Sequence, residues 1–529
     1  MLAPAESFPG RPATADVTPA RKINSDDLEK QHISAALEKL DIEHAIVLDD
    51  PRGWSHHRKN IILIIVSAAS MIAGLSANIQ NPANQNIEDD LHASPSSISL
   101  SLSLFILFQG IVPLLWSAVS EIKGRKVVYL LSFAIFILGS AIVAISKSIE
   151  LLIGMRVIQA AGSSAVIAIG TGTLADLYEP AERGSKIGLY YSAPLLGLSL
   201  GPILGGSLTQ GFNWRAVFWF LVIFAGLNFF SFLVFFNDTF RRERSSAYQA
   251  VMKRRSQERG QITSQLVVEN QGDDWARSKA DNSPLAIEAP PLRDIKLSLT
   301  DVNPFPPLLL ILKRWNNIAI LFPSGLFFAF SFSITYTCAR TMSNKYKYDA
   351  LQTGLVLLAF GIGCLSGSIL GGRWSDYKLA QIKTNDDGKS HPEMRLESTK
   401  VAMWFFPPSV VGYAWVCEKD VHVSAVCVML FLAGFFSIWI YASTLAYIVD
   451  ANVGRSSIAT ASNSAIRGIS AFVAAEVAVP LQDAIGDGGL YTIWAGVMIV
   501  AELFILLVLY QGGKWRERGQ AKEREAADK

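Results

Sequence analysis

Two arginines lie inside apolar stretches of this sequence, where a charge is costly. Arg156 begins the run Arg156-Val-Ile-Gln159, and Arg467 follows Asn463 by one helical turn. Because residues three or four positions apart share a helix face, each arginine is expected to act together with its amide neighbour. A guanidinium held there can bind an anionic group of a solute or tune a nearby carboxylate through which protons pass. The alternative for Arg156 is a side chain that extends to the outer membrane interface.

Two carboxylates, Glu476 and Glu502, also fall within apolar stretches. A buried carboxyl group is driven toward its neutral form, so either residue is a candidate proton carrier. Each also has a plainer interpretation, in which it pairs with Arg467 or lies near a membrane interface.

The stretches that position these residues are long enough to cross a bilayer. A helix needs about 20 apolar residues to cross a hydrocarbon core of about 30 Å. Twelve such stretches lie six and six around one long charged loop, at residues 61–79, 98–119, 127–146, 150–175, 185–210, 214–236, 316–339, 352–375, 401–417, 422–448, 457–481 and 489–510. Pro407 and Pro408 interrupt the ninth stretch, where a kink is expected. We therefore predict an all-α membrane protein with 12 transmembrane helices in two pseudo-symmetric six-helix bundles.

Composition narrows the class of protein. Of 529 residues 50% are hydrophobic and 17% are charged, and the formal net charge of +2 gives no reason to expect nucleic acid as a partner. The four cysteines lie in or at the ends of the stretches and are interpreted as buried apolar residues, without a disulfide or a metal site. No phosphate-binding G-x-x-x-x-G-K-[ST] loop and no hydrolase, nuclease or redox constellation is present. We expect no enzyme activity and no cofactor.

The distribution of basic residues predicts the orientation in the membrane. Lysine and arginine gather in the loop between the second and third stretches, in the central loop and in the C-terminal tail, whereas residues 80–97 carry only acidic charges. Since cytoplasmic loops are enriched in basic residues, both termini are expected in the cytoplasm. The predicted parts are a polar N-terminal segment (1–59), a first bundle (60–236), a central loop (237–315), a second bundle (316–510) and a tail (511–529).

The loop after the second stretch carries a recognisable motif. Ser117-Ala-Val-Ser-Glu121-Ile-Lys-Gly124-Arg125-Lys126 resembles the G-x-L-a-D-r-x-G-r-k signature of the major facilitator superfamily, and Gly372-Arg-Trp-Ser-Asp376 echoes it in the second half. The resemblance implies a cytoplasmic latch between the two bundles. In it Glu121 pairs with Arg125, close to Asp176 and to the start of the eleventh stretch at Ser456-Ser457. The plainer interpretation is a set of positive-inside anchors.

Two further motifs narrow the resemblance to one branch of that superfamily. Arg156-Val-Ile-Gln159-Ala160 resembles the R-x-x-Q-G motif of drug:proton antiporters, with alanine in place of glycine. The fifth stretch contains a G-x-x-x-G-P-x-x-G-G run, which resembles the antiporter signature of exporting members, at Gly197, Gly201, Pro202, Gly205 and Gly206. Together with Asn463 and Arg467, these motifs are similar to those of the fungal twelve-spanner drug:proton antiporters, near the quinidine-resistance and citrate-exporter types. Tyr190 and Tyr191 of the same stretch are expected to pack within the membrane or to line a cavity.

The resemblance implies a proton-coupled exporter that works by alternating access. Because the two intramembrane arginines favour an anion, we expect an organic acid such as citrate or itaconate, or an acidic secondary metabolite. The alternatives are a broad multidrug efflux pump, a facilitative uniporter and, from another class, a membrane receptor or scaffold. We expect the plasma membrane first and the vacuolar membrane second, and a monomer whose partners are its solute, protons and lipid.

Overall fold

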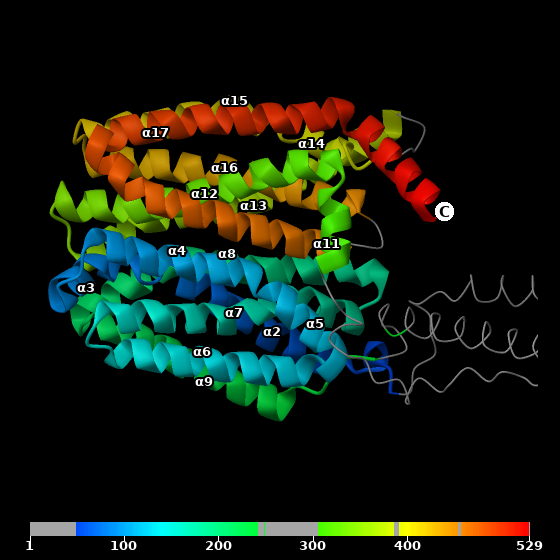
Figure 1. The fold of residues 1–529 in the computed structure, drawn as a ribbon, viewed down its shortest axis with the longest axis horizontal. Helices are drawn as coiled ribbons and strands as arrows, with labels where there is room; N and C mark the ends of the chain where they lie inside the picture. The colour runs from blue at the N-terminus through cyan, green and yellow to red at the C-terminus, as the bar shows by residue number, and fades with distance from the viewer. Residues whose placement is uncertain (1–48, 242–247, 249–304, 386–390, 453–455, 528–529) are drawn as a thin grey trace, which may run out of the picture.

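The computed structural model describes residues 49–241, 248, 305–385, 391–452 and 456–527, and the regular structure of these residues is helical. Long helices lie side by side in two groups (Figure 1). Helices of the first half of the chain fill the lower part of that view, and helices of the second half fill the upper part. The predicted all-α class is confirmed. Residues 1–48 of the predicted N-terminal segment and most of the predicted central loop lie outside the described residues.

Four long helices of the first half each begin at a residue whose side chain caps the helix. Ser55, Ser94, Ser148 and Asn213 each accept a hydrogen bond from a backbone N–H of the first turn. The second predicted stretch is divided at Pro113, which begins a new helix. The elements are η2 (Pro51–Gly53), α2 (His56–Asn78), η3 (Asn81–Ala83), α3 (Asn84–Leu91), α4 (Pro95–Ile111), α5 (Pro113–Lys123), α6 (Arg125–Ile145), α7 (Ile149–Leu177), α8 (Pro180–Gly211) and α9 (Trp214–Phe235).

Two helices of the second half contain residues that disturb regular helical geometry. The ninth stretch is one continuous helix through Pro407 and Pro408. The last two predicted stretches form two helices, labelled together as α17 (Ser456–Ala527), which meet at a kink at Gly486, where φ is 70°. A glycine is required there because a positive φ is costly for other residues. The elements are α11 (Phe305–Leu312), α12 (Trp315–Asn344), α13 (Ala350–Asn385), α14 (Met394–Glu397), α15 (Lys400–Glu418), α16 (Val423–Ala451) and α17 (Ser456–Ala527).

A polar network stabilises the bend of α17. The carboxylate of Glu418 accepts a hydrogen bond from the N–H of Gly488 at 3.2 Å, and this bond holds the pKa of Glu418 below its ordinary value. Lys345 lies 3.3 Å from the buried Asp487. The bend of α17 is therefore tied to the C-terminal ends of α12 and α15.

Ten helical segments among the described residues have the length and hydropathy to cross a membrane. Helix α15 is not among them, and the two predicted stretches in α17 count as one segment. Adding α15 and the second stretch of α17 recovers the twelve predicted crossings. Figure 1 shows these helices running roughly parallel, with α3 at one end of the molecule and α5, α11 and the C-terminus at the other.

Each half encloses its own apolar core. Phe133, Phe136 and Phe218 lie in the core of the first half, and Phe330 and Phe406 lie in that of the second. Between helices in lipid, packing and interhelical hydrogen bonds stabilise association, because lipid is as apolar as the side chains. The two cores agree with a duplicated bundle, while the exact domain boundaries stay a prediction.

Small residues bring the halves into close contact along two helix pairs. A methyl group placed on Gly110 of α4 would lie 2.7 Å from the Cα of Gly468 in α17. On α13, a methyl group placed on Gly361 would lie 2.5 Å from the Cα of Ser199 in α8. Neither position has room for a side chain, so both helix crossings depend on glycine.

Candidate functional site

A charge cluster forms where α5 meets α6, at the end of the molecule that carries the C-terminus. Arg125 lies 3.1 Å from the carboxylate of Glu121 and 3.4 Å from that of Asp176, at the end of α7. Gly124 precedes it with φ at 85°, a value that favours glycine, and Asp238 accepts a hydrogen bond from the N–H of Arg125 at 3.1 Å. The side chain of Arg125 is only 10% exposed, so this ion pair is largely withdrawn from water.

These contacts of Arg125 all belong to the first half of the chain. The side chains of Ser456 and Ser457, which the motif places near the cluster, lie outside the part that the structure describes. That the cluster latches the two bundles together therefore stays a prediction.

The second half contains a matching cluster. Arg395, just before α15, lies 2.7 Å from Asp450 at the end of α16 and 3.5 Å from Asp376 on α13. Sequence reasoning singled out Asp376 but missed the other two residues. The sequence did contain a signal for Asp450. Asp176 lies at the end of the fourth stretch and Asp450 at the end of the tenth, which is the corresponding stretch of the second half.

Arg156 is completely buried in the first half. Its Nη1 atom donates to the backbone carbonyl of Ser76 at 3.1 Å and to Oε1 of Gln159 at 2.6 Å. The predicted pairing with Gln159 is therefore present in the structure. The ring of Phe105 covers the guanidinium, with its centroid 4.0 Å from Cζ. The side chain does not extend to a membrane interface.

The guanidinium of Arg156 has unused hydrogen-bonding capacity. Its Nε and Nη2 atoms are buried and have no hydrogen-bond partner. Within the described residues, Arg156 forms no ion pair. A buried cation without an anion is costly, and its free N–H groups match the oxygens of a carboxylate.

Arg467 is arranged in a similar way in the second half. Its guanidinium lies over the ring of Phe328, 3.8 Å from the centroid, and 5.3 Å from that of Tyr441. Its Nε atom also has no partner. The adjacent Asn463 accepts from Ser324 at 2.7 Å and donates to Tyr441 at 3.4 Å.

Three aromatic residues near the arginines escaped sequence reasoning. Phe105, Phe328 and Tyr441 carry no signal in a single sequence, because an aromatic side chain in an apolar stretch is common. Phe105 belongs to a small apolar cluster that joins residues of both halves, and Phe328 packs against that cluster. Tyr191 of α8, for which both packing and cavity lining were expected, packs edge-on against Tyr190, with ring centroids 5.3 Å apart.

The two carboxylates lie in different environments on α17. Glu476 accepts a short hydrogen bond from Ser103 of α4, and this bond joins the two halves. The neighbouring Ala475 carbonyl accepts from Ser99 at 2.8 Å. Glu502 is buried, and its Oε1 atom has no partner. Thus Ser103, rather than Arg467, is the described partner of Glu476.

The glycine-rich run of α8 packs against two helices. A methyl group placed on Gly197 would overlap backbone atoms of α2. One placed on Gly205 would overlap the backbone of Ile79, just after α2, and one on Gly201 would lie 3.3 Å from the N atom of Ile79. A methyl group placed on Gly206 would instead lie 2.3 Å from the backbone oxygen of Ala350 on α13. One placed on Gly354 of α13 would lie 2.4 Å from the backbone oxygen of Pro202. The run therefore joins helices within the first half and also joins the two halves.

The two helical groups, the buried Arg156 without an ion pair and the matching charge clusters are those of a membrane transporter built from two similar halves. The chain belongs to the Major Facilitator Superfamily, whose model matches residues 66–475. It is therefore a multi-pass membrane transporter and not an enzyme.

Known proteins agree with this assignment. The chain is 27% identical to the MFS antiporter QDR3 of Candida albicans, over 89% of this chain and 80% of the relative. It is 28% identical to citrate exporter 1 of Aspergillus niger, over 89% of this chain and 88% of the relative. Its fold is similar to that of the human organic anion transporter MFSD10, with a TM-score of 0.54, 16% identity, and coverage of 84% of this chain and 99% of that one.

Proposed function

We propose that this transporter is a proton-coupled exporter of small organic anions. The observation that carries the proposal is the buried Arg156, which has two N–H-bearing atoms without partners and no ion pair among the described residues. An anionic solute supplies the missing charge and the missing acceptors at once. Similarity to a citrate exporter supports the same class of solute.

Alternating access would expose the arginines to each side in turn. In the present arrangement Phe105 covers Arg156, and Phe328 lies against Arg467. Movement of the two halves would have to displace these rings before a solute reached either guanidinium. Coupling requires that proton binding and solute binding bias this movement in opposite directions.

Glu476 and Glu502 are the candidate proton carriers. Glu476 bonds across the interface between the halves, so a change in its protonation would alter the contact between α4 and α17. Glu502 has a free carboxyl oxygen but no described contact with the other half. Glu476 is therefore the stronger candidate for coupling a proton to movement.

Arg156→Ala tests the proposed role of the arginine. In proteoliposomes with an imposed proton gradient, we expect the initial rate of citrate transport to fall about 10- to 100-fold, because hydrogen bonds to a charged partner are lost. Arg215→Ala is the control, since Arg215 forms a partly exposed ion pair with Asp90. Normal transport by correctly inserted Arg156→Ala protein would reject the proposal.

A broad drug exporter is the second candidate. The aromatic rings that cover both arginines, and the similarity to QDR3, favour lipophilic solutes. Competition between citrate and quinidine in one efflux assay separates the two candidates, because an anion site is blocked by acids alone. Flux that is insensitive to a protonophore would instead indicate a uniporter.

The membrane and the orientation also belong to the proposal. Lysine and arginine in the loop between the second and third stretches, in the central loop and in the C-terminal tail favour both termini in the cytoplasm. We expect the plasma membrane as the first location and the vacuolar membrane as the second. A tag at the C-terminus should be accessible only after the plasma membrane is permeabilised.

A further inference from the structure

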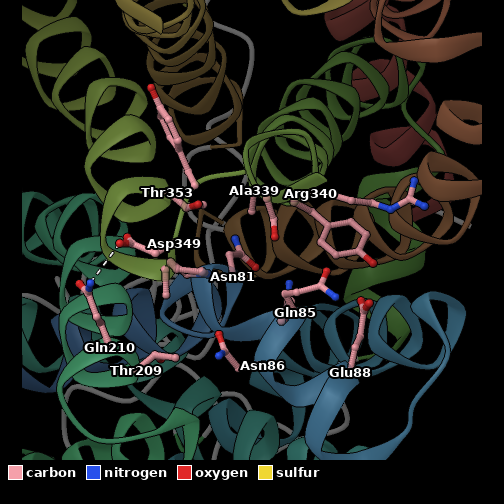
Figure 2. Close-up of a pocket in the computed structure, with 16 residues that line it drawn as sticks. Asn81, Gln85, Asn86, Glu88, Thr209, Gln210, Ala339, Arg340, Asp349 and Thr353 are labelled. Atoms are coloured by element: carbon pink, nitrogen blue, oxygen red, sulfur yellow. Dashed lines mark hydrogen bonds between the residues drawn. The ribbon is translucent and has the colours of Figure 1, made fainter. Parts of the chain in front are cut away.

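A cavity of about 250 Å³ lies between the two halves, at the end of the molecule that carries α3. We call it the vestibule. Figure 2 shows that its walls come from η3, α3 and the end of α8 in the first half, and from the end of α12 and the start of α13 in the second. At about 30 Å³ for each water molecule, it has space for roughly eight waters or for one six-carbon solute.

Two lining residues have buried polar atoms without partners. Asn84 is 7% exposed and Thr209 is 6% exposed. Neither Nδ2 of Asn84 nor Oγ1 of Thr209 has a hydrogen-bond partner. Leaving buried donors and acceptors unpaired is costly. A ligand with hydroxyl groups satisfies both atoms, because a hydroxyl donates and accepts.

The charges around the vestibule disfavour an anion. Glu88 and Asp349 contribute carboxylates, whereas the charge of Arg340 is already balanced by Asp483 at 2.6 Å. The remaining polar lining is dominated by amides and hydroxyls, including Gln85, which Figure 2 shows in the middle of the cavity. Such a lining suits a neutral molecule with several hydroxyl groups, unlike the surroundings of Arg156.

We propose that the vestibule is a second binding site, which takes a small neutral polyhydroxy solute of monosaccharide size. It is separate from the anion site at Arg156 and does not depend on what the protein exports.

Binding at the vestibule would hold the two halves together. Gln210 of α8 donates to Asp349 of α13 at 3.0 Å, and Tyr336 of α12 donates to the carbonyl of Pro95 in α4 at 3.3 Å. A solute bound between these helices favours the arrangement in which they are close. Occupancy would therefore slow any transport step that separates the halves at this end.

The test is a binding titration of the purified full-length protein in lipid nanodiscs, with glucose as the probe and saturation-transfer NMR as the readout. We expect saturable binding of glucose and weaker binding of gluconate and glucosamine, its charged relatives. Thr209→Val should weaken glucose binding about twofold to tenfold, because one net hydrogen bond is lost. Since the Thr209 hydroxyl has no partner in the protein, valine should leave the fold intact.

Thr492→Val is the matched control, because Thr492 lies near the bend of α17 and does not line the vestibule. Arg156→Ala should bind glucose normally, so a failure of the export proposal would not affect this result. The proposal would be overturned if glucose binding did not saturate, or if gluconate or glucosamine bound as tightly as glucose or more tightly. It would also be overturned if Thr209→Val and Thr492→Val changed glucose binding equally.

Discussion

The two charge clusters have the same parts but differ in burial. In the first half, the side chain of Arg125 is 10% exposed and that of its partner Asp176 is 21% exposed. In the second half, the corresponding values for Arg395 and Asp450 are 27% and 40%. An ion pair withdrawn from water is costly to break, whereas an exposed pair is weak. The two halves thus share the pattern of charges, while only the first cluster is expected to be essential for the fold.

The largest effect is expected from Arg125→Ala. This change leaves Asp176 without its cation in a largely buried position, and we expect a loss of about 3–5 kcal/mol in the free energy of unfolding. The measurement is the denaturation midpoint of the purified protein, together with its abundance in membranes. Arg125→Lys keeps the charge but loses the planar fork of donors, so it should recover only part of the loss. An unchanged midpoint for Arg125→Ala would show that burial does not distinguish the two clusters.

The comparison also shows what a single sequence can reveal. Glu121, Arg125 and Asp176 were predicted together because the resemblance to the superfamily motif implies that they lie close to one another. Arg395 was missed because it follows a long polar insertion, so no short spacing links it to Asp376. The pattern of apolar stretches predicted the crossings well, but continuity through Pro407 and Pro408 depends on packing that one sequence does not display.

Contacts between the halves were hidden for a similar reason. Ser103 and Glu476 are 373 residues apart in sequence, and nothing in either local pattern indicates that they meet. The same holds for Gly110 and Gly468, whose close approach depends on how two distant helices cross. Thus Arg156 and Arg467 could be found from the sequence. The aromatic rings that lie over them, and the vestibule, could be found only from the three-dimensional structure.

A smaller effect is expected from Arg395→Ala. Its pair with Asp450 is short but partly exposed, and its pair with Asp376 is longer. Solvent screening limits such pairs to about 1 kcal/mol or less, so the denaturation midpoint should shift much less than in Arg125→Ala. Both variants are compared in the same detergent and at the same ionic strength. A loss as large as that of Arg125→Ala would mean that the second cluster is equally essential for the fold.

The smallest effect is expected from Asp376→Asn. The side chain of Asp376 is 78% exposed and lies 3.5 Å from Arg395. Neutralising this carboxylate should therefore change the free energy of unfolding by less than about 0.5 kcal/mol. Transport should also stay within about twofold of the wild-type rate if this cluster only anchors α13, since so small a change in energy corresponds to about that factor. The measurement pairs the denaturation midpoint with the initial transport rate in proteoliposomes. A tenfold slower rate at an unchanged midpoint would contradict this expectation. It would instead indicate that Asp376 gains a partner in another arrangement of the two halves, as a latch requires.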